Sequence, residues 1–160
     1  MLLGTDGTVT HILEAYAGEP IEVVKLLQEY DIATAADAPL EVAAEAKVLR
    51  RRVLLRGRRS GQNLLYAEVT VVPERVDPTL LAGLVTTDKP VGVLLAENRT
   101  ETFRVILVAK REPAGPCAPH FHVQPTALVI SRTYRILARQ EPIMLITEKF
   151  PEGFFRSLPG

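Results

Sequence analysis

Apolar and polar residues alternate with the two-residue period of a β-strand along most of the chain. Six segments with this pattern are predicted as strands: residues 20–30, 48–56, 64–73, 100–110, 127–138 and 143–150. Helical spacing, with capping residues at the ends, predicts short helices at residues 11–17, 78–84 and 91–97. The alanine- and acid-rich residues 33–46 are expected to form a connector with one or two helical turns.

Turn signals link neighbouring predicted strands over short distances. Residues 58–63 and 139–142 each lie between two alternating segments and indicate hairpin turns. Strands joined in this way run antiparallel, so the sequence predicts an α+β fold, a single six-stranded antiparallel sheet with short helices packed on it. No internal repeat or domain boundary is visible, which favours one domain over residues 1–160. The proline-rich residues 113–125 are expected to form a long irregular loop that is functional or mobile.

The predicted strand at residues 48–56 carries an arginine on its apolar face. At the two-residue period Arg51 shares a face with Leu49, Val53 and Leu55, whereas the opposite face is mostly charged and is expected to face solvent. A buried guanidinium stays charged and needs an anion. That anion is either a carboxylate of the protein or part of a bound ligand, and the strand pattern leaves both open.

The last predicted strand carries a lone carboxylate in a similar setting. Glu148 shares a face with Met144, Ile146 and Phe150. A buried glutamate either pairs with a cation or works as an acid or base. A buried Arg51–Glu148 ion pair is therefore one interpretation. The other is a small polar molecule that spans the two side chains, with its carboxylate on Arg51 and its hydroxyl on Glu148.

Two further features are candidate parts of an anion site. Val91 and Gly92 lie in the first turn of a predicted helix, where backbone amides lack internal acceptors, although ordinary capping by Asp88 is the simpler alternative. Arg132 lies on the apolar face of its predicted strand and is a second possible inward cation. A side chain that snorkels to solvent near the sheet edge is the favoured interpretation of Arg132.

Composition limits the class of partner and the compartment. The 160 residues carry 19 Lys plus Arg and 19 Asp plus Glu, and this zero formal charge does not suggest a nucleic-acid partner. A lone cysteine, no leader peptide and no membrane-length apolar window indicate a soluble cytoplasmic protein. Cys117, His120 and His122 lie close together in sequence, but they make an incomplete ligand set for zinc, so no metal is expected.

Five segments match a known family in order and approximate spacing: DGTVT (residues 6–10), LRRRVLL (49–55), AEVTVVP (67–73), KPVG (89–92) and EPIMLITE (141–148). On these segments the chain resembles the chorismate pyruvate-lyase (4-hydroxybenzoate synthase) family. The resemblance implies a six-stranded antiparallel sheet and an enzyme that uses no cofactor. It also implies the reaction, the conversion of chorismate to 4-hydroxybenzoate and pyruvate, with chorismate as the partner of a monomer or small homo-oligomer.

The same resemblance implies roles for particular residues. Arg51 would bind the ring carboxylate, assisted by backbone amides near Val91 and near Val9, and Glu148 would meet the ring hydroxyl. Residues 113–125 differ from the family pattern and are expected to reshape the lid of the site. The rival is a non-catalytic domain that binds an aromatic carboxylate, like the effector domains of some transcription regulators. Those domains follow a DNA-binding helix-turn-helix, and the chain shows no such segment, which favours the enzyme.

Overall fold

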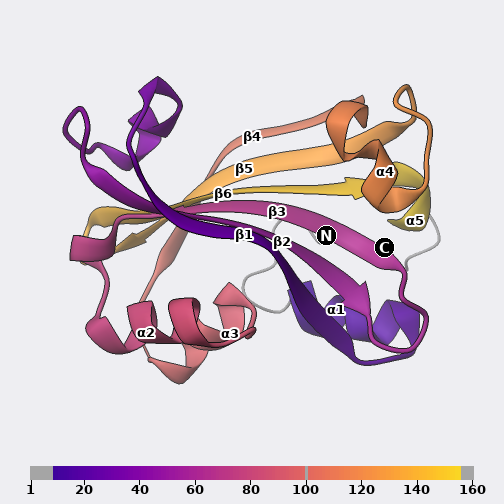
Figure 1. Cartoon of the computed structure of the whole chain (residues 1–160), viewed down its shortest axis with the longest axis horizontal. Coiled ribbons are helices and arrows are strands. Elements are labelled where there is room, and N and C mark those ends of the chain that lie inside the picture. The colour runs from indigo at the N-terminus through magenta and orange to yellow at the C-terminus, as the bar shows by residue number, and fades with distance from the viewer. Residues whose placement is uncertain (1–8, 100, 156–160) are drawn as a thin grey trace.

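A computed structural model describes residues 9–99 and 101–155. In this part of the chain six strands form one sheet in the order β1-β2-β3-β6-β5-β4, and every neighbouring pair is antiparallel (Figure 1). The strands are β1 (Ile21–Ile32), β2 (Lys47–Gly57), β3 (Asn63–Val71), β4 (Phe103–Pro113), β5 (Leu128–Ala138) and β6 (Glu141–Pro151). The predicted α+β fold is confirmed.

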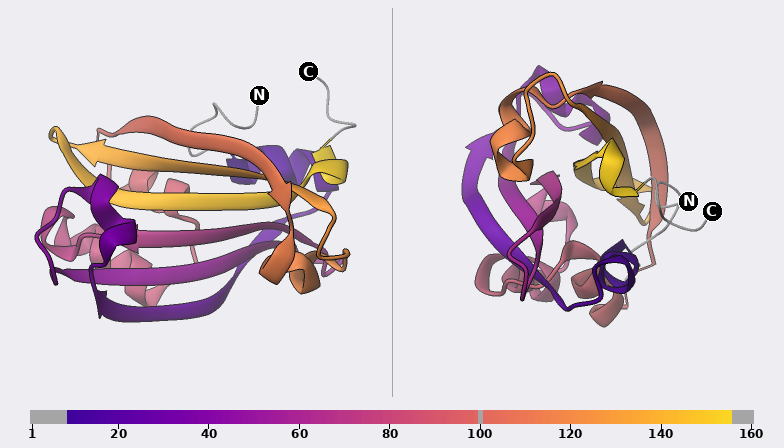
Figure 2. Two further views of the ribbon diagram at one scale, coloured as in Figure 1. Left: turned by 90° about the horizontal axis from the view of Figure 1, so that it is seen from above. Right: turned by 90° about the vertical axis from the view of Figure 1, so that its right-hand side faces the viewer.

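Short helices lie against both faces of this strongly curved sheet (Figure 2). The α-helices are α1 (Val9–Ala17), α2 (Pro78–Thr86), α3 (Val91–Glu97), α4 (Ala118–Phe121) and α5 (Glu152–Phe155). The 3-10 helices are η2 (Ala35–Leu40), η3 (Pro73–Arg75) and η4 (Gly115–Cys117). In Figure 1 α1, α2 and α3 lie on one side of the sheet and α4 lies on the other. No described helix is long and apolar enough to cross a membrane.

The core on the side of α1, α2 and α3 has two parts. Leu80 and Leu84 of α2 and Leu94 of α3 pack on one end of the sheet, against strand residues such as Met144 and Ile146. At the other end of the sheet Leu13 of α1 packs in a second cluster. This cluster includes the strand residues Val53, Leu55, Leu65, Ala67 and Phe150. The inward faces predicted for β2 and β6 are therefore confirmed. Residues of both clusters line one pocket on this side of the sheet.

The proline-rich segment 113–125 is compact, so the prediction of a long irregular loop is wrong. β4 continues to Pro113, and η4 and α4 follow it directly. Pro116 and Pro119 stand in the first turns of these two short helices, where a missing amide hydrogen does no harm. Cys117 and Phe121 then pack with Leu54 of β2.

This segment covers the sheet face that Arg51 does not share. Leu54 alternates with Arg51 and Val53 along β2, so it points to the opposite side of the sheet. The predicted role of residues 113–125 in a lid over the site is therefore wrong. The prediction that this opposite face is mostly solvent-exposed is also wrong in part, since Val48 and Leu54 are buried there.

A hairpin turn and a register shift determine how β4, β5 and β6 align. Arg139 and Gln140 both adopt positive φ angles, 53° and 66°, which is the type I′ geometry that suits a two-residue hairpin between β5 and β6. In the sheet order β4 is an edge strand, and a register shift separates Ile106 from Val108. The hairpin brings Arg132 opposite Glu148, and the edge strand supplies Arg104.

Candidate functional site

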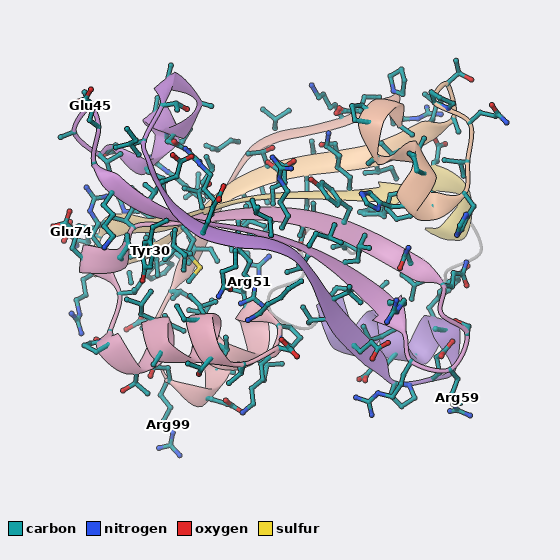
Figure 3. All side chains as sticks on the ribbon, in the orientation of Figure 1. Tyr30, Glu45, Arg51, Arg59, Glu74 and Arg99 are labelled. Carbon is teal, nitrogen blue, oxygen red and sulfur yellow. The ribbon has the colours of Figure 1, made fainter. Side chains whose placement is uncertain are left out.

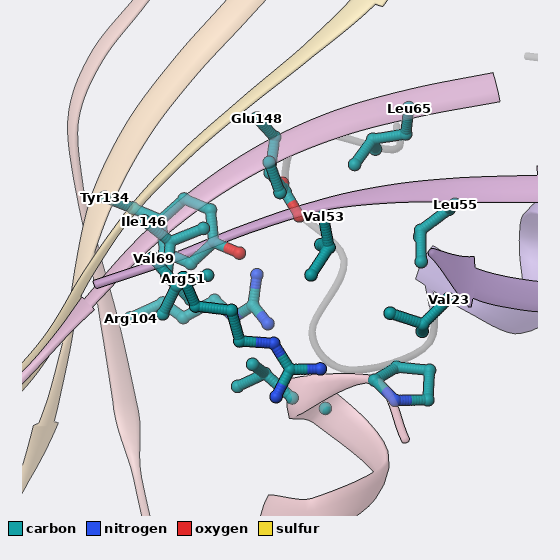
Figure 4. Close-up of a pocket in the computed structure, with 14 residues that line it drawn as sticks. Val23, Arg51, Val53, Leu55, Leu65, Val69, Arg104, Tyr134, Ile146 and Glu148 are labelled. Carbon is teal, nitrogen blue, oxygen red and sulfur yellow. The ribbon is translucent and has the colours of Figure 1, made fainter. Parts of the chain in front are cut away.

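A partly open pocket lies between the sheet and the start of α3. Its outline encloses about 570 Å³ of space without atoms, some of it open to solvent. The lining residues are Val23, Arg51, Val53, Leu55, Leu65, Ala67, Val69, Pro90, Val91, Gly92, Arg104, Tyr134, Ile146 and Glu148. Most of the wall is apolar, and the charged side chains project into it from different strands (Figure 4). This arrangement suits a small, partly apolar molecule that carries charge.

Arg51 is a buried cation whose described hydrogen-bond partners are backbone carbonyls. The side chain is 1% exposed and points from the sheet toward α2 and α3 (Figure 3). Its Nη1 donates to the carbonyl of Leu84 at 3.2 Å and its Nη2 to that of Lys89 at 3.0 Å, while Nε has no partner. Burial lowers the pKa of Arg51, and the charge of Asp88 opposes that shift only in part. Among the described residues no carboxylate forms a salt bridge with Arg51, so the pocket presents a positive charge to an anion.

The interpretation of Arg51 and Glu148 as a buried ion pair is wrong. Strand β3 runs between β2 and β6, so Arg51 is opposite Val69, and Glu148 is opposite Ala67. Two strand spacings separate β2 from β6, roughly 10 Å. The small side chain of Ala67 between them helps to form the pocket floor. The two charged groups are therefore held apart, as a ligand that spans them requires.

Glu148 instead pairs with Arg132, its neighbour across β5 and β6. Arg132 Nε donates to Glu148 Oε1 at 2.5 Å, and the two residues are 1% and 8% exposed. The interpretation of Arg132 as a snorkelling side chain is wrong, because β5 lies inside the sheet between β6 and β4. Arg132 is not among the residues that line the pocket. It acts as a positioning residue, which holds the Glu148 carboxylate as a hydrogen-bond acceptor toward the pocket.

Tyr134 and Arg104 complete the polar part of the wall and were not singled out as site residues by the sequence pattern. Two guanidinium groups lie over the Tyr134 ring, with Arg104 Cζ 4.5 Å and Arg132 Cζ 4.8 Å from its centroid. Burial, and then the charge of Glu148, raise the pKa of Tyr134, so its hydroxyl remains protonated and can donate. Arg104 alternates with Phe103 and Val105. On this edge strand Phe103 and Val105 are exposed, whereas Arg104, between them, lines the pocket.

The start of α3 lines the pocket as the anion-site prediction requires. Pro90 is the N-cap residue, and no side chain caps this end, so the alternative of capping by Asp88 is wrong. Asp88 lies instead 3.7 Å from Lys25 Nζ. Val91 and Gly92 reach the pocket, and amides in the first turn of a helix have no acceptor within that helix.

The remaining candidates are Val9 and the cysteine and histidines of residues 117–122. Val9 is the first residue of α1, and the motif residues before it lie outside the described part of the chain. Cys117 is buried on the opposite face, where its Sγ donates to the Ala114 carbonyl at 3.0 Å and burial raises the pKa of the thiol. His120 stacks on Tyr66. Within the described residues no group of three potential metal ligands gathers.

Solved structures with the same fold include bacterial transcriptional regulators and effector domains of such regulators. The effector domain of PhnF from Mycobacterium smegmatis superposes with a TM-score of 0.69 at 14% identity, covering 90% of this chain and 88% of that one. A GntR-family transcriptional regulator from Bacillus cereus gives 0.68 at 8% identity, with coverage of 88% and 97%. At these identities the comparison establishes the fold class, a six-stranded sheet shared with effector domains.

The family follows from sequence. The model of the chorismate pyruvate-lyase Rv2949c-like family matches residues 2–158, so the chain belongs to this family. Curated relatives named chorismate pyruvate-lyase include a protein of Mycobacterium tuberculosis (strain H37Rv), 26% identical over 99% of this chain and 82% of the relative. Another, from Mycobacterium leprae, is 29% identical over 99% of this chain and 76% of the relative. The family resemblance inferred from the five motifs is confirmed.

Proposed function

We propose that this protein is a chorismate pyruvate-lyase that converts chorismate to 4-hydroxybenzoate and pyruvate. The observation that carries the proposal is Arg51, a buried cation with no described carboxylate partner, facing a pocket that also holds Glu148. The membership of the chain in a family described by this activity supports the same reaction.

The polar groups of chorismate match the charged groups of the pocket. Chorismate carries a ring carboxylate, a ring hydroxyl and an enolpyruvyl ether with a second carboxylate. Arg51 binds the ring carboxylate, and its fork of donors suits a bidentate contact. The amides of Val91 and Gly92 add donors at the same end. Glu148, held by Arg132, accepts a hydrogen bond from the ring hydroxyl.

The reaction is an elimination that produces an aromatic ring. The ether bond between the ring and the enolpyruvyl oxygen breaks, and the ring carbon that bears the hydroxyl loses its hydrogen. The side chain gains that proton at its methylene carbon and leaves as pyruvate. No net oxidation or reduction takes place, so the step requires no redox cofactor. The protein contributes by orienting the ring between Arg51 and Glu148 and by stabilising charge that develops on the leaving group.

The direct test is to incubate the purified protein with chorismate and to identify the aromatic product by chromatography beside 4- and 3-hydroxybenzoate standards. We expect 4-hydroxybenzoate and pyruvate in equal amounts, with rates unchanged by an excess of chelator. An Arg51→Met variant serves as the control for uncatalysed breakdown of chorismate. Equal product from the wild type and this variant would contradict the proposal, and a rate lost in chelator and restored by zinc would contradict the mechanism.

A second function is favoured by the shared fold with effector domains. In that case the pocket binds an aromatic carboxylate and releases it unchanged. The two functions separate in one experiment. A lyase consumes chorismate in solution, whereas a binding domain shows a thermal shift with 4-hydroxybenzoate and no turnover of chorismate.

A further inference from the structure

We propose that Lys25 and Gln28 of the edge strand β1 are positioning residues for Arg51, which fix the direction of its guanidinium and thereby set the affinity of the pocket for a carboxylate. The proposal deepens the function given above and rests on it. Neither residue is among the described residues that line the pocket. Both act on Arg51 through the segment from the end of α2 to the start of α3, whose carbonyls accept hydrogen bonds from all three side chains.

Donors from two strands meet at the carboxyl end of α2. Lys25 Nζ donates to the Leu84 carbonyl at 3.3 Å, and Arg51 Nη1 donates to the same carbonyl at 3.2 Å. Gln28 Nε2 donates to the Val85 carbonyl at 3.1 Å. Carbonyls in the last turn of a helix lack donors within the helix, and the negative end of the helix dipole favours cations there. Lys25 and Arg51 are therefore connected through one shared acceptor.

A β-bulge brings Lys25 and Gln28 to the same face of the sheet. Residues three apart on a regular strand point to opposite faces. In β1 the register shifts directly after Lys25, where Leu26 is an extra residue. As a result Lys25 is opposite Val53 and Gln28 is opposite Arg51, and both of these partners lie on the pocket face of β2. The bulge thus directs both side chains toward the end of α2.

The same segment orients the guanidinium of Arg51. Arg51 Nη2 donates to the Lys89 carbonyl at 3.0 Å, so two carbonyls of the segment hold the two terminal nitrogens of the side chain. A guanidinium has more N–H donors than these two carbonyls use, and the donors that remain, including that of Nε, are available to a carboxylate. The direction of the remaining donors depends on where the segment lies. Lys25 and Gln28 hold the segment from β1, and Lys25 Nζ also lies 3.7 Å from Asp88 within it.

The expected consequence is a change in the affinity for a carboxylate and not in the chemical step. In the proposed reaction Arg51 binds the ring carboxylate, which is the same group in the substrate and in the transition state. An interaction that stabilises both states equally changes KM and leaves kcat unchanged. Loss of the donors from β1 should therefore weaken the binding of substrate and product alike.

The test measures binding and turnover on the same variants. For Lys25→Met we expect KM for chorismate and the dissociation constant of 4-hydroxybenzoate to rise about 5–20-fold, with kcat within about twofold of wild type. Gln28→Met should act in the same direction with a smaller effect, because it removes a neutral donor. Lys25→Arg keeps a charged donor and should retain most of the affinity. Benzoate, which lacks the hydroxyl, should lose affinity for each variant by the same factor as 4-hydroxybenzoate.

Lys47→Met is the matched control. Lys47 of β2 also contacts β1, since its Nζ lies 4.2 Å from the centroid of the Tyr30 ring, and neither residue is among the described residues that line the pocket. The variant removes a lysine that joins the same two strands without touching the segment between α2 and α3. It should change neither KM nor either dissociation constant.

Several results would overturn the positioning role. A Lys25→Met variant with wild-type affinity for 4-hydroxybenzoate contradicts it, as does a fall in kcat at unchanged KM. Weaker binding of 4-hydroxybenzoate with unchanged binding of benzoate also contradicts it, because the effect would then lie at the hydroxyl end. If Lys25→Met melts early, the other variants decide: wild-type affinity in Gln28→Met, or a loss of about 5-fold or more in a folded Lys25→Arg, contradicts the proposal.

The same measurements separate this failure from failure of the proposed function, because calorimetry of 4-hydroxybenzoate requires no turnover. A wild type that converts chorismate while Lys25→Met matches it in every constant overturns the positioning role alone. A wild type that binds 4-hydroxybenzoate without converting chorismate overturns the lyase, and the binding constants of the variants still decide the role of Lys25. A wild type that binds neither benzoate nor 4-hydroxybenzoate overturns both.

Discussion

Arg50 and Arg51 are neighbours in sequence and lie on opposite faces of β2 with opposite surroundings. Arg50 donates to Asp31 at 2.9 Å and to Asp37 at 2.8 Å, and its Nη1 also reaches Thr70 at 3.2 Å. These carboxylates raise the pKa of Arg50. Arg51, on the pocket face, donates to two carbonyls, and burial lowers its pKa.

The difference separates a cation that the protein neutralises from one that has only carbonyl partners among the described residues. The charge of Arg50 is neutralised by the protein, so its hydrogen bonds tie η2 and β1 to β2. The charge of Arg51 is desolvated without a neutralising carboxylate among the described residues, which is costly in the empty pocket and favourable once an anion enters. We therefore expect a carboxylate bound at Arg51 to gain affinity from neutralising this buried charge.

The largest expected effect is the loss of turnover when Arg51 is removed. Arg51→Met should lower kcat/KM for chorismate about 10³–10⁴-fold, because a buried charge-assisted contact to the ring carboxylate is lost. The melting temperature should change little, since the variant also removes the desolvation cost of the cation. Kinetics run beside thermal melts provide the measurement. A variant that unfolds at room temperature would indicate that Arg51 serves the fold as Arg50 does.

The next effect is on stability when Glu148 loses its charge. Glu148→Gln removes the carboxylate charge that Arg132 Nε binds in the interior, and we expect unfolding free energy to fall by about 3–5 kcal/mol. The double variant Glu148→Gln with Arg132→Met should recover most of that loss, because it also removes the buried cation of the broken pair. Turnover should stay low in both, since neither retains the oriented carboxylate. Full activity in the stable double variant would remove Glu148 from the site.

A smaller effect is expected on the opposite face, at the buried carboxylate that binds Arg50. Asp37→Asn should lower the free energy of unfolding by about 1–3 kcal/mol, because Arg50 loses one of its two charged partners and the Thr34 amide loses a charged acceptor. Turnover of chorismate should stay within about twofold of wild type. Urea denaturation and steady-state kinetics test the two halves of this statement. A variant with normal stability and impaired turnover would contradict the division of roles between the faces.

The smallest effect is a dependence of stability on pH that comes from the Arg50 side of the sheet. Hydrogen bonds from Arg50 lower the pKa of Asp31 and of Asp37 below the ordinary value of 3.8. A carboxyl with a lowered folded pKa stabilises the protein fully above its unfolded pKa and loses that contribution as pH falls through the folded value. Urea midpoints should therefore drop below about pH 4 more steeply for wild type than for Asp37→Asn. Parallel curves would contradict this.

Much of the fold could be predicted from the two-residue alternation, because burial on one face of a sheet imposes that period on the strands. The predicted strands match β1, β2, β3, β5 and β6 to within a few residues. The edge strand β4 was placed three residues early, at residues 100–110, where residue 100 lies outside the described part. Most residues of β4 are exposed, so alternating burial does not mark where this strand begins and ends. Prolines in 113–125 suggested a loop because a proline fits a first helical turn as well as it fits irregular backbone.

Pocket residues could be predicted where the pattern of a single strand reveals them. They could not be predicted where they depend on how strands pair across the sheet. Arg51 and Glu148 stand out as charges on apolar faces, and both line the pocket. The pairing of Glu148 with Arg132 depends on which strand follows which across the sheet, and Arg104 depends on the exposure of β4. The alternation of apolar and polar residues within one segment predicts neither the Glu148–Arg132 pairing nor the position of Arg104. Sequence reasoning therefore placed Arg51 and Glu148 on the face that carries the pocket, and it did not identify Arg132 as the partner of Glu148.

The most direct test of the central claim is a crystal structure of the protein with 4-hydroxybenzoate bound. We expect the carboxylate in a two-point contact with the Arg51 guanidinium, close to the amides of Val91 and Gly92, and the hydroxyl within hydrogen-bond distance of Glu148. The Arg132–Glu148 pair should remain intact. A product bound in the reverse orientation, or bound outside the pocket with the Arg51 guanidinium still donating to Leu84 and Lys89 alone, would contradict the claim that Arg51 is the anion site.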